Sequence, residues 1–367
     1  MTGTAIATIP LVRLDNEAVW EAVHEELREL VLRGEFILGS HVEAFEEEAA
    51  AAFGCRWAIG ASSGTSALTM ALRASPLARG SRVGVPANTF FATFEAIVLA
   101  GHVPVVIDHD EDHLISLDAL VAADVNGVVP VHLFGLPVDM PALMRLAGER
   151  GWWVLEDCSQ AQGATVDGRP VGSFGHAGAF SAYPTKNLGA WGDAGFVTGA
   201  DPDLRGRILG LRHHCQVAPN VHGGIGGADR LDNIQALVLR EKLRRLPAEV
   251  EARRRVGEWY RQALAGLGLK LPGDRGDRTH AYHQFVVRVP DRDAVRERLA
   301  GEGIGTGVHY PTPVHLQPGA AGLYEAPIRP VRAEGWSEQI LSLPMYPALS
   351  EGEVAWVAEA LKRALSR

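Results

Sequence analysis

The sequence predicts an α/β protein with a largely parallel central sheet and a smaller α+β domain at its C-terminal end. Short apolar runs alternate with helical patterns through the first two-thirds of the chain. These runs are almost continuously apolar, which is typical of parallel strands that helices cover on both faces. From about residue 204 the pattern changes to longer amphipathic helices, which indicates a second structural unit.

The elements of the large domain follow this alternation in chain order. Strands are expected at residues 57–60, 82–85, 103–107, 127–131 and 152–155. Helices are expected between them at residues 65–74, 89–100, 117–123 and 140–150. Two further strands, at residues 178–181 and 195–198, flank a loop that contains Lys186.

The last third of the chain is predicted to be more helical. Two helices are expected at residues 229–246 and 248–267, followed by a polar connection at residues 272–279. A strand at residues 283–289 and helices at residues 291–302 and 351–365 complete the pattern. We therefore expect a large domain, residues 1–246 with an N-terminal helical arm, and a small domain, residues 247–367.

The composition is that of an ordinary globular protein, with 47% hydrophobic and 22% charged residues. A formal net charge of −9 argues against nucleic acid or anionic membranes as partners. The sequence has no run of about 18 uncharged apolar residues and no secretion signal pattern. Cys55, Cys158 and Cys215 lack CxxC spacing, so neither disulfides nor a zinc site is expected. A cytoplasmic protein is expected.

Lys186 is the most informative residue, because lysine is scarce in this chain and this one lies in an uncharged segment. The chain has four lysines against 31 arginines, and residues 179–192 contain no other charge. An amine whose surroundings disfavour its charged form becomes a nucleophile toward carbonyls. Lys186 is therefore a candidate Schiff-base residue. A structural lysine that holds a helix C-terminus or a buried carboxylate fits the segment equally well.

Residues 60–66, with the sequence Gly-Ala-Ser-Ser-Gly-Thr-Ser, connect a predicted strand to a predicted helix. Small residues let the backbone approach an anion, and the N-terminus of a helix offers unpaired N–H groups. Thr65 and Ser66 would add hydroxyl donors. The segment is neither a Walker loop nor a GxGxxG motif, and such turns are common. It is a candidate phosphate site.

The strand at residues 152–155 runs directly into Glu156 and Asp157. Because side chains alternate along a strand, one of the two carboxylates is expected to face the crevice at the strand's carboxyl end. That carboxylate could pair with a protonated ring nitrogen, cap a helix or bind an arginine. Phe90, at the start of another predicted helix, could stack on a planar ligand, although a phenylalanine there is more often core.

Together these residues supply an amine, a phosphate cradle, a carboxylate and an aromatic face. Pyridoxal 5′-phosphate (PLP) needs these four services, because the protein must hold the cofactor and tune it as an electron sink. No single feature is specific. Their joint occurrence on an α/β chain indicates PLP.

Beyond these features, the chain resembles the DegT/DnrJ/StrS family of PLP-dependent nucleotide-sugar aminotransferases over nearly its whole length. The matching stretches are residues 36–39 (FILG), 62–65 (SSGT), 130–135 (PVHLFG), 156–161 (EDCSQA), 183–189 (YPTKNLG), 230–232 (RLD) and 309–311 (HYP). The run at residues 183–189 is highly specific to the family. The resemblance implies a fold-type-I architecture like that of aspartate aminotransferase, with a mostly parallel seven-stranded sheet.

The resemblance also implies a role for individual residues. Lys186 forms the Schiff base, Asp157 pairs with the ring nitrogen and Phe90 stacks on the ring. Gln160 lies near the 3-hydroxyl of the cofactor. The implied phosphate contacts are Ser63, Gly64, Thr65 and Ser181. The implied substrate contacts are Tyr183, His309, Tyr310 and Arg230.

The implied reaction moves an amino group from an amino acid, commonly L-glutamate, through PLP and its amine form PMP to a keto sugar nucleotide. The run at residues 309–317 favours 3-keto acceptors, for example a dTDP-linked 3-keto-6-deoxyhexose. Family members are homodimers that share active sites, so residues 211–230 are expected to reach the neighbouring subunit's site.

Several positions depart from the family pattern. The departures are at Ala182, His213, Cys215, Gly227 and Ala228. At the position of Ala228 the family commonly has an asparagine that reaches the partner's cofactor phosphate.

Two other functions remain open. One is a PLP-dependent sugar dehydratase, against which Lys186 argues because related dehydratases have histidine there. The other is a PLP-binding regulator without turnover. The histidines show no metal-binding spacing, and no metal site is expected.

Overall fold

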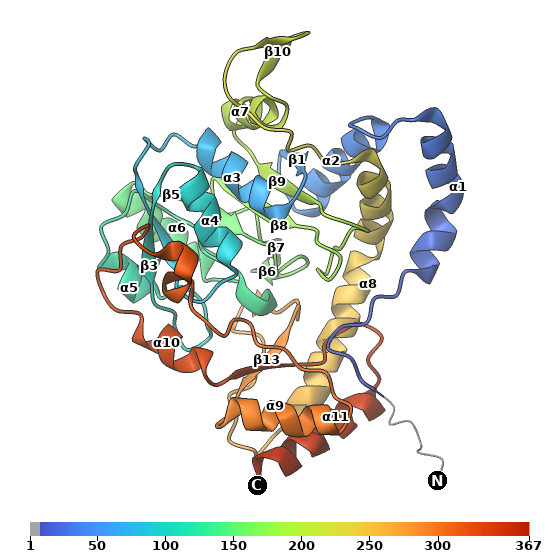
Figure 1. Ribbon diagram of the computed structural model, residues 1–367, viewed down its shortest axis with the longest axis vertical. Helices are drawn as coiled ribbons and strands as arrows, with labels where there is room; N and C mark the ends of the chain where they lie inside the picture. Colours follow the sequence, from blue (N-terminus) through green and yellow to red (C-terminus); the bar gives the residue numbers. More distant parts are fainter. Residues whose placement is uncertain (1–7, 367) are drawn as a thin grey trace.

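The computed structural model describes residues 8–366 and has a seven-stranded sheet at its centre (Figure 1). The strand order is β1-β9-β8-β5-β4-β2-β3. Strand β9 is antiparallel to β1 and β8, and the other neighbours are parallel. The prediction of a mostly parallel seven-stranded sheet is confirmed. The strands are Trp57–Ala61 (β1), Arg82–Pro86 (β2), Val103–Ile107 (β3), Gly127–Val128 (β4), Trp153–Asp157 (β5), Ala177–Ser181 (β8) and Gly195–Gly199 (β9).

Helices cover both faces of this sheet, as its apolar strands require. Leu155 points into a core shared with α3, α4 and α7, whereas its neighbour Val154 points into a core shared with α5 and α6. Phe180 and Phe196 stack with ring centroids 4.4 Å apart in a third core beneath α2 and α8. The helices are Glu17–Arg33 (α1), Ser40–Ala52 (α2), Gly64–Ala74 (α3), Phe91–Leu99 (α4), Leu117–Val121 (α5), Met140–Arg150 (α6), Pro202–Arg212 (α7) and Asn233–Ala263 (α8).

The prediction of two helices at residues 229–246 and 248–267 is wrong, because α8 is one continuous helix that contains Pro247. A proline inside a helix removes one backbone hydrogen bond and costs about 3 kcal/mol. Here Leu243, Leu246 and Val250 are buried in the same core on both sides of the proline. Their burial favours a continuous helix over a break. Among the described residues, no helix has both the length and the apolar character needed to cross a bilayer.

The C-terminal part of the chain forms an α+β unit around the end of α8 (Figure 1). Its antiparallel strands pack with the helices on a separate core that includes Tyr260, Phe285 and Tyr346. Its elements are Phe285–Arg288 (β13), Arg292–Gly301 (α9), Ile340–Leu343 (β14) and Glu351–Leu365 (α11). The helix Val331–Ser337 (α10) instead contributes Ala333 to the core beneath α3 and α4. Because α8 crosses residues 246 and 247, the exact domain division stays a prediction.

Short elements complete the fold. Three strands form a small sheet in the order β12-β6-β7, and β10 pairs with β11 in a hairpin that projects from the body beside α7 (Figure 1). The strands are Thr165–Val166 (β6), Arg169–Pro170 (β7), Gln216–Ala218 (β10), Val221–His222 (β11) and Arg278–Thr279 (β12). Short 3-10 helices lie at Leu133–Gly135, Val314–Leu316 and Pro318–Ala320.

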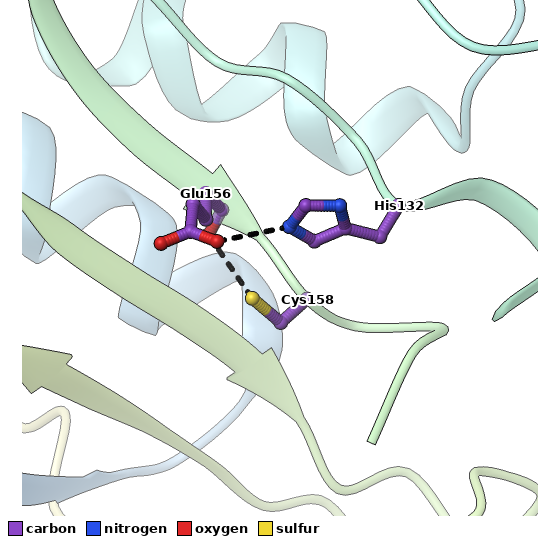
Figure 2. A group of neighbouring side chains, drawn as sticks. All are labelled: His132, Glu156 and Cys158. Carbon is purple, nitrogen blue, oxygen red and sulfur yellow. Dashed lines mark hydrogen bonds and ion pairs between the residues drawn. The ribbon is translucent and has the colours of Figure 1, made fainter. Parts of the chain in front are cut away.

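Glu156 anchors the end of β5 to residues 172–175 and to His132, and Glu156 is 0% exposed. The backbone N–H groups of Phe174 and Gly175 donate to Oε1, each at 2.7 Å, and that of Gly172 donates to Oε2 at 2.9 Å. The imidazole of His132 lies 3.1 Å from Oε2 (Figure 2). Four donors therefore hold this carboxylate.

The hydrogen bonds of His132 define which of its ring nitrogens carries the proton. Its Nδ1 accepts the backbone N–H of Val138 at 3.0 Å, so Nε2 carries the proton and donates to Glu156. Potential metal-ligand atoms of His132, Glu156 and Cys158 lie within 4.8 Å of one another (Figure 2). Since N–H donors already occupy the carboxylate, we interpret the group as a backbone anchor and not as a cation site.

We predict that Glu156→Gln lowers the free energy of unfolding by about 2–4 kcal/mol, because an amide NH₂ would then face backbone donors. Urea unfolding at fixed protein concentration measures the change. The exposed Glu149→Gln on α6 is the matched control and should leave stability within about 0.5 kcal/mol of the original. Equal stabilities of the two variants would contradict the anchoring role.

Candidate active site

A cavity of about 500 Å³ lies at the carboxyl ends of β5 and β8, beside the first turn of α3. These parallel strands end at one edge of the sheet, where α/β proteins commonly bind ligands. The volume suits a small cofactor together with part of a substrate. The predicted site residues that line the cavity are Ser63, Gly64, Thr65, Phe90, Asp157, Gln160, Ser181, Tyr183, Lys186, His309 and Tyr310. Arg230 does not line it.

Lys186 reaches the cavity from the loop between β8 and β9. Ala182 N donates to Ala194 O at 2.8 Å and Ala190 N donates to Ala182 O at 2.8 Å, which closes this loop at its base. A Cβ on Gly189 would collide with the carbonyl oxygen of Pro184, so the turn after the lysine requires glycine. Burial lowers the pKa of Lys186 from 10.5 to about 8, against the opposing effect of the Asp157 charge.

Asp157, the last residue of β5, is 3% exposed and lines the cavity, whereas Glu156 does not. Its Oδ2 accepts the hydroxyl of Thr93 at 2.8 Å, and its Oδ1 accepts the backbone N–H of Ser159 at 3.0 Å. The Thr93 hydroxyl lies 3.0 Å from that of Thr89. Two uncharged donors thus fix the orientation of the carboxylate, which lines the cavity and is available to a ligand.

The first turn of α3 forms the cradle at the other side of the cavity. Ser63 caps the helix by accepting the N–H of Ser66 at 3.1 Å. The N–H groups of Gly64 and Thr65 belong to the first turn, where no helical partner exists. A Cβ on Gly64 would lie 2.5 Å from Cβ of Ser181, so only glycine lets this turn approach the end of β8. The arrangement favours an anion.

Gln160, His309 and Tyr310 form a hydrogen-bonded wall of the cavity. Gln160 accepts the N–H of Phe134 at 2.8 Å and donates to the hydroxyl of Tyr310 at 3.0 Å. The ring of Tyr310 packs against Phe90 with centroids 5.6 Å apart. His309 Nδ1 lies 2.7 Å from Ser342 Oγ, and burial and then the Lys186 charge lower its pKa to about 4. His309 is therefore neutral near pH 7, and burial raises the pKa of Tyr310, so that its hydroxyl is neutral as well.

These residues fit PLP. A lysine with a lowered pKa, a fixed carboxylate, an anion cradle that a Cβ would fill and an aromatic edge surround one cavity of suitable volume. Lys186 would hold the aldehyde end, Asp157 the ring nitrogen and the first turn of α3 with Ser181 the phosphate.

The structure also places residues that the sequence did not single out. Thr93 and His283 line the cavity, but only tertiary contacts reveal this, since neither lies in a recognisable motif. The prediction that Ser66 adds a donor to the cradle is wrong, because its hydroxyl donates to Asp229 Oδ1 at 2.8 Å. Arg230 Nη1 instead lies 3.1 Å from His213 Nδ1, outside the cavity.

Comparisons with known proteins agree with this site. The DegT/DnrJ/EryC1/StrS aminotransferase family matches residues 18–362. A UDP-N-acetyl-3-dehydro-alpha-D-glucosamine 3-aminotransferase from Acidithiobacillus ferrooxidans is 42% identical over 90% of each chain. A dTDP-3-amino-3,4,6-trideoxy-alpha-D-glucose transaminase from Streptomyces venezuelae is 38% identical over 95% of this chain and 94% of its own. A crystal structure of NtdA from Bacillus subtilis with bound cofactor PMP is 28% identical, with a TM-score of 0.91, covering 100% of this chain and 87% of its own.

We predict that Thr93→Val weakens PLP binding about tenfold, because Asp157 loses a charge-assisted hydrogen bond. Thr93→Ser should retain the original affinity. Fluorescence titration of the apoprotein with PLP measures the dissociation constant. Thr69→Val is the matched control, since the Thr69 hydroxyl is buried without a partner on α3, outside the cavity lining. Equal affinities of Thr93→Val and Thr69→Val would contradict the role of Thr93.

The labelling of Lys186 by an amine reagent in the apoprotein should rise with pH around a midpoint of about 8. The deprotonated amine is the reactive form, so the rate increases as pH rises through the pKa. In Asp157→Asn the midpoint should fall further, because the removed negative charge favours the ammonium. Mass spectrometry of the labelled peptide measures both profiles. A midpoint near 10.5 in the original protein would contradict the assigned environment.

Proposed function

The chain belongs to the DegT/DnrJ/EryC1/StrS aminotransferase family, and we propose that it transfers an amino group from L-glutamate to a keto sugar carried on a nucleotide. The observation that carries this proposal is the meeting of Lys186, Asp157 and the first turn of α3 in one cavity. Aminotransfer with PLP needs a nucleophilic amine, a carboxylate at the ring nitrogen and an anion cradle.

Bound PLP would draw electrons from the substrate carbon that carries the amine, which makes a proton on that carbon removable. Lys186 is suited to accept this proton on Nζ and return it, because a pKa of about 8 leaves both its forms populated near neutral pH. Asp157 would keep the ring nitrogen protonated, held in place by Thr93 and Ser159.

The proposed acceptor is a 3-keto sugar nucleotide. Two relatives are named for amination at carbon 3, one on a UDP sugar and one on a dTDP sugar. A dTDP-linked 3-keto-6-deoxyhexose remains the acceptor that the sequence favours. Tyr183, His309 and Tyr310 line the cavity and are proposed to contact substrate.

The working form is proposed to be a cytoplasmic homodimer with shared active sites. The β10–β11 hairpin and the segment after it expose apolar side chains, with Val217 71% and Ile225 84% exposed. Such a surface favours burial against another copy. Arg230, which does not line the cavity of its own chain, is proposed to reach the neighbouring subunit's site. The division at residues 246 and 247 is proposed as the domain boundary.

The decisive experiment gives the holoenzyme ¹⁵N-labelled L-glutamate and a panel of 3-keto and 4-keto sugars linked to UDP and dTDP. We expect the label on carbon 3 of one acceptor. Lys186→Ala should retain its circular dichroism and transfer no label. Lys362→Ala, which removes a lysine ion-paired with Glu359 on α11, should transfer label at the original rate.

Other outcomes would favour the rival functions. A product that lost a hydroxyl without gaining label would indicate a dehydratase. A protein that binds PLP but changes none of the acceptors would indicate a regulator.

A further inference from the structure

His283 lines the cavity from the segment that precedes β13, and it is 8% exposed. Among the described residues that line the cavity, two have a buried side-chain polar atom without a hydrogen-bond partner: His283, at Nδ1, and Gln284, at Oε1. Leaving a buried polar atom unpaired costs about 1–3 kcal/mol. Among the described residues neither side chain makes a hydrogen bond, so both wall residues keep hydrogen-bonding capacity that a ligand in the cavity can use.

The backbone around these two residues is fixed. Gln284 N donates to Phe134 O at 3.1 Å. The carbonyl of Tyr282 accepts a hydrogen bond from the buried guanidinium of Arg253 at 3.1 Å. Both side chains are therefore presented by a preorganised segment, which is how specific binding residues are usually held.

The imidazole of His283 is neutral near pH 7. Burial lowers its pKa well below 6.5, and the charges of Lys186 and Arg253 act in the same direction. A neutral imidazole offers one N–H donor and one acceptor lone pair, and a glutamine amide also offers both. Hydroxyl groups can use both kinds of partner.

The charged residues of the cavity indicate whether this wall binds an anionic or a neutral part of a ligand. The carboxylates that line the cavity belong to Asp157 and Asp193, the lysine that lines it is Lys186, and no arginine of the described chain lines it. His309 and Tyr310, on the same C-terminal side as His283, are neutral. A carboxylate or diphosphate would find no cation on this wall, whereas a neutral polyhydroxylated ring would find several donors and acceptors.

We propose that His283 and Gln284 bind hydroxyl groups of the acceptor's sugar ring and so determine which sugars are aminated. The inference rests on the proposed function, because it assigns one wall of that site to one part of its substrate. The nucleotide and the diphosphate lie away from this wall.

The test measures binding to the holoenzyme by calorimetry, with UDP, UDP-N-acetylglucosamine, dTDP and dTDP-glucose as probes. The quantity compared is the ratio of the Kd of the bare nucleotide to the Kd of its sugar conjugate. We expect His283→Leu and Gln284→Leu to lower this ratio about fivefold to tenfold, while the Kd of the bare nucleotide is unchanged. The unchanged Kd also shows that the variants are folded.

His102→Leu is the matched control. His102 is also buried with an unpartnered Nδ1, but it does not line the cavity. The ratio should stay at its original value in this variant. The first half-reaction with L-glutamate, followed by absorbance, should proceed at the original rate in all three variants.

Three outcomes would overturn the inference, and they are distinguishable. If the holoenzyme prefers the sugar conjugates and His283→Leu and Gln284→Leu keep that preference, the inference fails while the proposed function stands. If these variants slow the glutamate half-reaction instead, the two residues serve the amino donor. If the original protein shows no preference for any conjugate, the proposed acceptor class itself fails.

Discussion

Two successive carboxylates at the end of β5 point in opposite directions, and the rest of the site depends on this alternation. Glu156 turns into the protein, where three backbone N–H groups and His132 hold it. Asp157 consequently faces the cavity, and Thr93 and the backbone of Ser159 orient it without a cationic side chain among its hydrogen-bond partners. One residue fixes the strand end, and the next is free to act on a ligand.

The environment of Lys186 follows from the same geometry. Its loop closes across β8 and β9, which brings the partly buried Lys186 to the cavity at the end of β5. Burial favours the neutral amine, and Asp157 partly restores the ammonium, so the pKa settles at about 8. Both effects are needed. Without burial, the pKa of Lys186 would stay near 10.5 and the amine would remain protonated at neutral pH. Without the carboxylate of Asp157, the pKa would fall further and the amine would hold a proton less well.

Much of this was predictable from local sequence. The apolar strands gave the order of elements, and alternation along β5 limited the crevice to one carboxylate. Thr93 was not predictable, because its role comes from a hydrogen bond to Asp157, 64 positions away in the sequence. His283 was not predictable either, because only the folded chain shows that it lines the cavity. The prediction of a helix break at Pro247 is wrong, because burial of Leu246 and Val250 in one core outweighs the cost of a proline inside the helix. Ser66 was misassigned because Asp229, distant in sequence, accepts its hydroxyl.

The proposed chemistry requires that Lys186, and no other amine, bonds covalently to the cofactor. Borohydride reduction of the holoenzyme followed by peptide mass spectrometry tests it directly, because reduction makes the bond between lysine and PLP permanent. We expect a pyridoxyl group on Lys186 alone among the four lysines. A pyridoxyl group on Lys242, Lys270 or Lys362, or on none of the four, would contradict it.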